Sequence, residues 1–282
     1  MQALPPLPPL DSTELTQYFL LKVSFNINKP PPFRRPELAD VAARAYADDA
    51  FPDLELHDQG ARALAQVLHV ERAGFSELEL RSLAARTRLV DDVVRDFFQR
   101  HPEGLAIGLF SGPCTRFSRV DNGLLHWVDL DVPYVAEWKS RHAPQTSRYT
   151  LAAGCCACHH WLDRLAEAPD WPTLLIGVGR FSQLGAEPLS NFLTHATLRL
   201  GAGVEVLLDA SPALDLRPHK QGPGYRVQIH REDGAVESFP WLKVLAEDGY
   251  PEPLGSRVRA ENRAARTTSS GSTPLLCHLR LA

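Results

Sequence analysis

The chain has 282 residues, of which 44% are hydrophobic and 23% charged, and its formal net charge is −4 at pH 7. This length allows one sizeable core with appendages, and the composition is that of a soluble globular enzyme. The acidic balance argues against a nucleic-acid-binding protein, which normally has a basic surplus, and no apolar run approaches the ~20 residues that cross a bilayer. We therefore expect neither a nucleic-acid nor a membrane partner.

The N-terminus and the cysteines favour a cytoplasmic protein with reduced thiols. Residues 1–10, MQALPPLPPL, lack both the basic segment and the uninterrupted apolar core of a signal peptide. Three of the five cysteines, Cys155, Cys156 and Cys158, lie within four positions. That spacing is not typical of a secreted, disulfide-linked domain.

The first third of the chain predicts helices. A Pro-rich segment, residues 1–36, is followed by apolar residues at helical spacing from about 37 to 72, so we assign a helical segment to 37–76. A long amphipathic helix is expected from about 77 to 101. Residues 255–282 are polar at first and low in apolar content, and we expect a flexible tail there.

The middle of the chain, within an α/β domain assigned to 77–254, alternates strands and helices. Its apolar runs lie at 105–110, 124–131, 149–153, 172–178 and 203–210. Continuous apolar runs suit strands buried on both faces, and their alternation with helices indicates a parallel sheet. Two extended runs around Asp233-Gly234 predict a hairpin.

The ends of the first two expected strands carry the residues that suit a ligand site. In an open parallel sheet, ligands bind beyond the carboxyl ends of the strands. The first strand leads into a turn with Gly112, where the backbone can approach a ligand closely, and the second ends with Asp129 and Asp131. A carboxylate at this place can accept hydrogen bonds from ribose hydroxyls, although a single acidic residue there more often faces solvent or caps a helix.

Four segments, in a fixed order along the chain, resemble those of a known protein family. Together with a further short element that follows them, they cover about residues 80–210. They are ARTRLVDDVVRDFF, LFSGPCTRFSRVD, WVDLDVPYVAEWK and RYTLAAGCCACHHWLDRL. In this order and spacing they resemble the leucine carboxyl methyltransferase-like family, including its polyketide O-methyltransferase branch. The resemblance implies a Rossmann-like class I methyltransferase fold, with a mostly parallel sheet flanked by helices, an N-terminal helical cap on the substrate side, and S-adenosylmethionine as cofactor.

Position by position, the resemblance implies five cofactor-binding residues. The guanidinium of Arg86 would meet the carboxylate of the cofactor, a pairing that suits its bidentate geometry. Asp131 would bind the ribose, and the remaining positions match the glycine-rich turn and the element after the fourth strand: Gly112, Thr115 and Gly179.

Several positions depart from the family pattern. Phe110 stands where the family has the first glycine of the turn, and the acidic positions of the family are occupied by Cys114, Cys158 and Val178. Each lost carboxylate removes a hydrogen-bond partner. Two hypotheses therefore stand: an O-methyltransferase acting on a hydroxyl or carboxylate of a small molecule, and a catalytically inactive protein of this fold that binds an unknown protein partner or an altered ligand.

Other chemistry-bearing residues give weaker signals. The ligand types for zinc gather in Cys155, Cys156, Cys158, His159 and His160, but they crowd into six positions, so we predict no metal site and interpret the cysteines as small apolar residues.

Among the remaining basic side chains, we expect Arg116 and Arg119 to be solvated at the surface and His126 to be structural. His195 and His219 are both candidates for a general base, and nothing in the sequence favours one of them.

Overall fold

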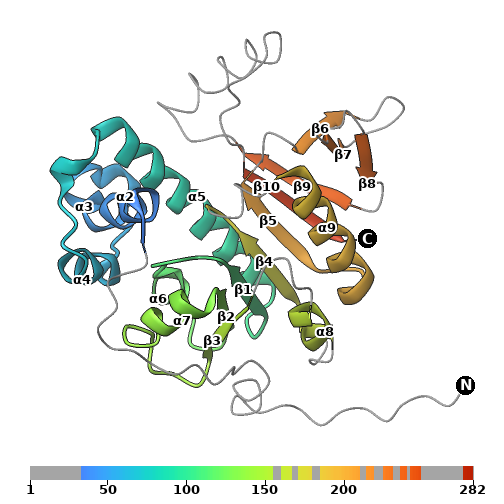
Figure 1. Cartoon of the computed structure of the whole chain (residues 1–282), viewed down its shortest axis with the longest axis horizontal. Coiled ribbons are helices and arrows are strands. Elements are labelled where there is room, and N and C mark those ends of the chain that lie inside the picture. Colours follow the sequence, from blue (N-terminus) through green and yellow to red (C-terminus); the bar gives the residue numbers. More distant parts are fainter. Residues whose placement is uncertain are drawn as a thin grey trace, which may run out of the picture.

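The centre of the molecule is a seven-stranded sheet with the strand order β3-β2-β1-β4-β5-β10-β9. A computed structural model describes residues 33–154, 160–166, 171–179, 185–209, 214–218, 225–230, 236–239, 242–248 and 276–281. The five strands β1 (Leu105–Leu109), β2 (His126–Asp131), β3 (Tyr149–Ala153), β4 (Thr173–Gly177) and β5 (Glu205–Asp209) are parallel. The chain passes from β1 to β2 on one side and from β3 to β4 on the other, so the order reverses between β1 and β4 (Figure 1). The predicted Rossmann-like α/β fold, with a mostly parallel sheet flanked by helices, is confirmed.

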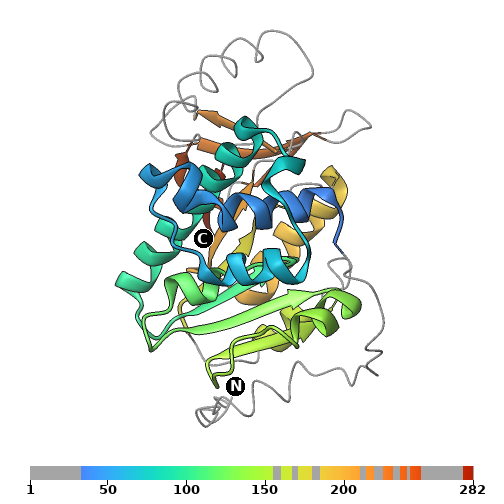
Figure 2. The ribbon, with the colours of Figure 1, turned by 90° about the vertical axis from the view of Figure 1, so that its left-hand side faces the viewer.

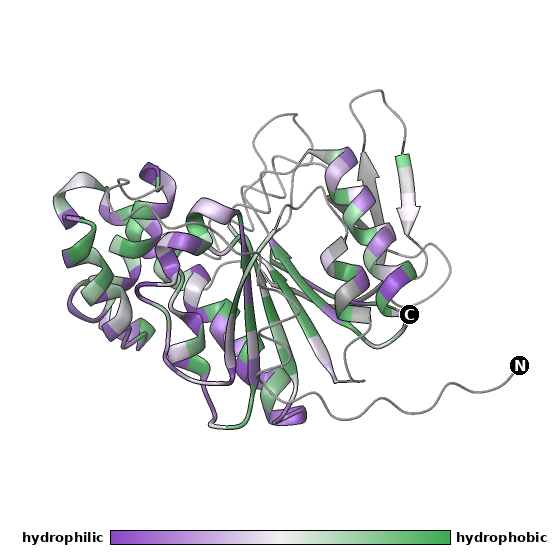
Figure 3. Ribbon diagram, turned by 60° about the horizontal axis from the view of Figure 1, so that its bottom comes forward, coloured by the Kyte–Doolittle hydropathy of each residue, from purple (hydrophilic) through white to green (hydrophobic). Residues whose placement is uncertain are grey.

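Helices connect the parallel strands and flank the sheet. α6 (Arg116–Val120) follows β1, α7 (Pro133–Lys139) follows β2, α8 (His160–Ala166) follows β3, and α9 (Ala186–Leu200) follows β4. β1, β4 and β5 are buried at every position, as the continuous apolar runs predicted. Figure 3 shows these central strands as apolar and the helices as mixed, with polar residues on their outer faces.

The N-terminal helices form a cap with a hydrophobic cluster of its own. It consists of α2 (Arg35–Ala45), α3 (Ala47–Ala50), the 3-10 turn η1 (Pro52–Leu54), α4 (Gln59–Val67) and the turn η2 (Arg72–Gly74). α4 starts at Asp58, whose carboxylate accepts a hydrogen bond from the Ala61 amide at 2.8 Å. α2 packs against both α4 and the long helix α5 (Glu77–Arg100), and Figure 2 shows α2 and α4 side by side in front of the sheet.

α5 joins the cap to the sheet. Its first turn is capped by Ser76 and carries Glu77 and Glu79, and its last turn carries Arg100, which complements the helix dipole. The apolar stripe of its second half packs on the sheet, where Val90, Val94, Phe97 and Phe98 are buried. The helix expected at 77–101 is confirmed.

The C-terminal segment corrects the predicted tail. β10 (Leu276–Leu281) runs antiparallel between β5 and β9 (Leu242–Asp248). Cys277, Leu279 and Leu281 lie in the main core cluster, so the expectation of a flexible tail is wrong for these six residues. The prediction extended the polar character of residues 255–275 to the short apolar segment that follows them. Because this segment is a strand of the main sheet, the α/β unit extends beyond residue 254. Residues 249–275 lie outside the described part.

A second, three-stranded sheet has the order β6-β7-β8, formed by β6 (Leu214–Pro218), β7 (Tyr225–His230) and β8 (Val236–Phe239). β7 and β8 pair antiparallel, as expected for the two runs that flank Asp233-Gly234, although the turn itself lies outside the described residues. Among the described residues, no helix is long and apolar enough to span a bilayer.

Candidate functional site

A crevice of about 210 Å³ opens at the carboxyl ends of β1 and β4, where the strand order reverses. Ligands of doubly wound sheets bind at such a reversal. One wall comes from the sheet and the loops after β1 and β4, and the other from α2 and α5. Three of the five predicted cofactor residues, far apart in the sequence, line it together: Arg86, Gly112 and Gly179.

Arg86 and Gly179 meet at one carboxylate, that of Asp209 at the end of β5. The Gly179 amide donates to Asp209 Oδ2 at 2.7 Å, and Arg86 Nη1 donates to the same oxygen at 3.4 Å. Arg86 Nη2 also donates to Asp40 of α2 at 2.6 Å, so the guanidinium joins the cap to the sheet. Burial raises the pKa of Asp209, and Arg86 acts against that rise.

The turn after β1 holds Asp131 in place. Gly112 has a φ of +57°, a left-handed conformation that suits glycine, and its amide donates to Asp131 Oδ2 at 3.2 Å. The Asp131 side chain is 2% exposed and lies next to the crevice rather than in its lining. Asp131 is the last residue of β2, as predicted, and this position places its carboxylate beside Gly112.

Lys139 occupies the buried space behind this carboxylate. Its ammonium donates to Asp129 Oδ2 at 2.8 Å, to Asp131 Oδ2 at 3.0 Å and to Ser111 Oγ at 2.8 Å. Asp129 also accepts from the Trp127 indole at 2.9 Å and from the Tyr149 hydroxyl at 2.7 Å.

The two carboxylates therefore titrate differently. Burial opposes ionisation of both, but Lys139 and the hydrogen bonds lower the pKa of Asp129 overall. Burial raises the pKa of Asp131 to about 6, although Lys139 acts in the opposite direction. Of this pair, Asp131 is thus the carboxyl group with the higher pKa.

Phe110, where the sequence resemblance implies a glycine, has a backbone conformation that favours glycine. It has a φ of +52°, in the left-handed region that favours glycine. Its amide donates to the Leu130 carbonyl at 2.7 Å, and its ring, 8% exposed, joins the main core cluster and also lines the crevice. Val178, where the resemblance implies a glutamate, lines the crevice as well.

Thr115 is not part of this crevice. Its hydroxyl donates to Asp58 Oδ2 at 2.5 Å, and Arg119 donates to the same carboxylate oxygen. Arg119 also donates to Asp91 Oδ2 at 2.6 Å, and Arg116 donates to Asp91 Oδ1 at 2.8 Å. The structure therefore places Thr115 in a buried polar network between the cap and α6.

This network corrects the expectation that Arg116 and Arg119 are solvated. The Arg119 side chain is 4% exposed and that of Arg116 9%, because the buried carboxylates of Asp58 and Asp91 provide their partners. Their charges are neutralised inside the protein.

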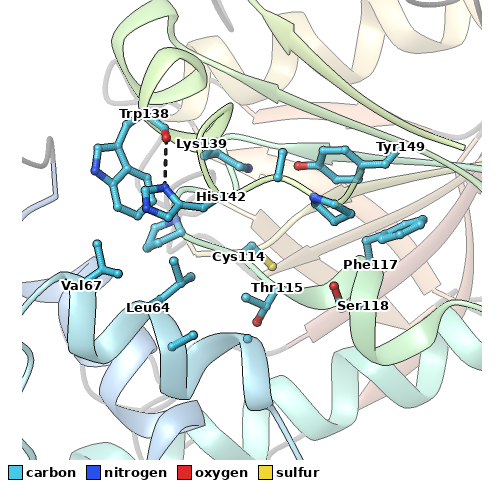
Figure 4. Close-up of a pocket in the computed structure, with 15 residues that line it drawn as sticks. Leu64, Val67, Cys114, Thr115, Phe117, Ser118, Trp138, Lys139, His142 and Tyr149 are labelled. Atoms are coloured by element: carbon cyan, nitrogen blue, oxygen red, sulfur yellow. Dashed lines mark hydrogen bonds between the residues drawn. The ribbon is translucent and has the colours of Figure 1, made fainter. Parts of the chain in front are cut away.

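A second cavity, of about 280 Å³, lies on the other side of the loop after β1 (Figure 4). It lies between α4, α6 and α7, and Tyr149, the first residue of β3, also lines it, so it flanks the sheet rather than covering the strand ends. The two cavities share only Pro113, and of the five predicted cofactor residues only Thr115 lines the larger one.

The remaining candidates stand apart from the crevice. His126 stacks on Trp171 with ring centroids 4.3 Å apart, and burial lowers its pKa, in keeping with the predicted structural role. His195, in α9, lines neither cavity, and His219 lies outside the described residues.

The structure adds nothing on the cysteine–histidine cluster. Cys155, Cys156, Cys158 and His159 lie outside the described residues, and of His160 only the backbone, at the start of α8, is described. Elsewhere in the described residues, no three potential ligands gather at one place.

Comparison with known proteins gives two curated relatives. The tetracenomycin polyketide synthesis O-methyltransferase TcmP of Streptomyces glaucescens is 29% identical over 228 residues, which cover 78% of this chain and 77% of TcmP. A protein of Mycolicibacterium gilvum, named as an S-adenosyl-L-methionine-dependent methyltransferase, is 26% identical over 73% of this chain and 69% of its own length. The chain is a relative of these methyltransferases. The resemblance of the sequence to polyketide O-methyltransferases is thereby confirmed, while no protein-family model matches the chain.

Solved methyltransferase structures are more distant. The glycopeptide N-methyltransferase MtfA, solved in complex with S-adenosyl-L-methionine, has 17% sequence identity and a TM-score of 0.37, over 68% of this chain and 87% of its own.

Two residues of the site were missed by sequence reasoning. Asp209 ends a continuous apolar run, the same signal that singled out Asp131, so it could have been found. Lys139 carried no signal, because only the packing of α7 against β2 brings its ammonium to the two aspartates.

Proposed function

We propose that this protein is an S-adenosylmethionine-dependent O-methyltransferase that acts on a hydroxyl or carboxylate of a small molecule. The observation that carries the proposal is the crevice at the reversal between β1 and β4, which gathers Arg86, Gly112 and Gly179. The two curated relatives support methyl transfer, and the name of TcmP supports oxygen as the acceptor.

The charges that line the crevice fit the amino-acid end of this cofactor. S-adenosylmethionine carries a carboxylate together with an ammonium and a sulfonium, both positive. The guanidinium of Arg86, which pairs with Asp40 and Asp209 in this structure, would exchange a partner for the carboxylate, and Glu37, Asp40 and Glu79 place acidic groups along the same lining. Both signs of charge are thus present where the cofactor needs them.

Asp131 fits the ribose. Within the described residues, both of its hydrogen bonds involve Oδ2, which leaves Oδ1 to accept from a ribose hydroxyl. Lys139 holds the carboxylate from behind and Gly112 holds it from the side of the loop, so its orientation is fixed before a ligand binds. In this arrangement the residues bind and orient, and none of them needs to react.

The bound cofactor supplies an electrophilic methyl group, and the protein aligns the acceptor oxygen with it. Alignment alone accounts for much of such a transfer, so a catalytic triad is not required. A hydroxyl acceptor must also lose its proton, and we assign that step to no described residue.

The test is a calorimetric titration with S-adenosylhomocysteine, followed by transfer of a labelled methyl group to a panel of phenols and carboxylic acids. Arg86→Met should weaken binding about 10- to 100-fold, because a charged hydrogen-bond pair is worth about 1.5–3 kcal/mol. Arg81→Met is the matched control: Arg81 lies on the same helix, pairs with Asp53 at the surface and does not line the crevice, so binding should stay unchanged. No heat with the unaltered protein at millimolar ligand would overturn the proposal.

Phe110 and Val178 favour a second candidate, a catalytically inactive protein of the same fold that serves as a binding or interaction module. Both side chains line the crevice where the family resemblance implies a glycine and a glutamate. The same titration separates the two candidates, and a Phe110→Gly, Val178→Glu variant that gains binding would identify these two positions as the cause.

A further inference from the structure

The cavity between α4, α6 and α7, which we call the flank pocket, is the larger of the two and has no role in the proposed methyl transfer. Its volume of about 280 Å³ lies just below the ~300–1,000 Å³ range of small-molecule sites. One side is formed by the cap, through Leu64 and Val67 of α4, and the opposite side by α7 (Figure 4). The exposed fraction of Val67 is 49%, so an apolar side chain lies open to solvent at its edge.

Aromatic rings form much of the wall. The rings of Trp138 and His142 are stacked, with centroids 4.3 Å apart and planes 26° from parallel. On another wall, Phe117 and Tyr149 meet edge to face at 5.3 Å. Aromatic side chains that line a cavity favour a planar aromatic occupant, because aromatic rings pair by offset stacking and by edge-to-face contacts.

The charges of the flank pocket exclude an ionic partner. None of its lining residues is acidic, so a cation would find no counter-charge. Lys139 lines it, but its ammonium already donates to Ser111, Asp129 and Asp131, which uses its three protons. An anion would therefore have to displace a buried ion pair, and a neutral molecule is favoured.

Polar groups for one or two hydrogen bonds remain. The Ser118 hydroxyl has no partner among the described residues, and His142 uses only Nδ1, which lies 3.3 Å from the Trp138 carbonyl oxygen. Figure 4 shows Cys114 and Ser118 among the residues that surround the pocket. A hydroxyl on an aromatic ring could pair with either Ser118 or the second nitrogen of His142.

We propose that the flank pocket binds a neutral, planar aromatic molecule of about two fused rings that carries a hydroxyl group. The occupant bridges the cap and the loop after β1, because α4 and Pro113 both line the pocket. It is not methylated there, since the crevice lies on the far side of that loop. The inference does not depend on the proposed cofactor site.

Calorimetry on the full chain with 2-naphthol tests this proposal. Two matched probes define the chemical class: n-decanol, which has the same number of heavy atoms but no ring, and 2-naphthoate, which keeps the rings but adds a negative charge. We expect 2-naphthol to bind at least about tenfold more tightly than either probe, a difference of about 1.4 kcal/mol. Absence of heat with 2-naphthol, or tighter binding of decanol or naphthoate, would overturn it.

Two variants locate the binding. Ala63 lies exposed on α4 and lines the flank pocket, so Ala63→Trp should fill the space and abolish binding without loss of folding, which a melting curve checks. Gln66→Trp, on the same helix but outside the lining, should bind as the unaltered protein does.

A chemical readout gives the position directly. Cys114 lines the flank pocket, whereas Cys277 is fully buried, so alkylation of the Cys114 peptide followed by mass spectrometry should slow when 2-naphthol is added. Binding that survives Ala63→Trp, together with unprotected Cys114, would place the ligand elsewhere and refute the proposal.

Discussion

Lys139 and Asp131 form a buried ion pair, with Nζ 3.0 Å from Oδ2 and exposed fractions of 5% and 2% for the two side chains. The same ammonium lies 2.8 Å from Asp129. One cation thus balances two carboxylates at the end of β2, and the proposed ribose site depends on its presence.

Lys139→Met should therefore destabilise the protein by about 3–5 kcal/mol, because it leaves two buried carboxylates without a counter-charge. Urea unfolding measures this loss. In an Asp129→Asn background the same change should cost less, since only one carboxylate then remains. An equal cost in both backgrounds would show that the ammonium does not act through Asp129.

Binding of S-adenosylhomocysteine should depend on pH through Asp131. Burial raises the pKa of this carboxyl to about 6, and the protonated form is the weaker acceptor for a ribose hydroxyl. Affinity should therefore be constant above about pH 7 and fall by up to about tenfold per pH unit below 6. Calorimetry between pH 5 and 8 measures it, and Asp131→Asn should bind weakly with no such dependence.

The stability of the protein should change with pH in the opposite sense. Because the folded protein holds this proton more tightly than the unfolded chain, Asp131 makes the free energy of unfolding fall as pH rises from about 4 to 6. Asp131→Asn should remove that contribution. A variant with an unchanged pH profile of unfolding would contradict the raised pKa.

Phe110→Gly should be more stable than Phe110→Ala, although a glycine variant is usually the less stable of the two. Both lose a buried ring and should be less stable than the unaltered protein by about 3–5 kcal/mol at most. At a φ of +52°, however, alanine keeps the left-handed strain that glycine relieves, which amounts to about 1 kcal/mol. The glycine variant should therefore melt at the higher temperature, and an alanine variant of equal or greater stability would refute the strain.

Arg119→Met should loosen the cap. This guanidinium, 4% exposed, pairs with both Asp58 and Asp91, and its removal should cost about 3–5 kcal/mol. Hydrogen exchange should increase first in α4, whose N-cap is Asp58. Arg35→Met is the control, because Arg35 is 61% exposed and its ion pair with Glu79 at the surface contributes less than about 1 kcal/mol. Similar losses of unfolding free energy in both variants would show that the buried ion pairs contribute no more stability than a surface ion pair.

The order of the elements could be predicted from the sequence because apolar periodicity and glycine and proline signals are local. The five parallel strands and α5 lie within a few residues of their expected ranges. The strand at Leu276–Leu281 was missed for a physical reason. It pairs antiparallel with β5 and β9, and a long polar stretch of sequence separates it from both partners. Nothing local to it indicates that β5 needs a neighbour.

The candidate site divides in the same way. Local sequence signals are enough to place Gly112 and Asp131 after consecutive strands and so close together, since parallel strands end at one edge of the sheet. The charges around them depend instead on how the chain packs. Packing buries Arg116 and Arg119 beside carboxylates, places Lys139 between two aspartates and pairs Arg86 with Asp209. Residue type alone does not predict these pairs, because the electrostatics of a side chain depend on its partners and on the exclusion of water.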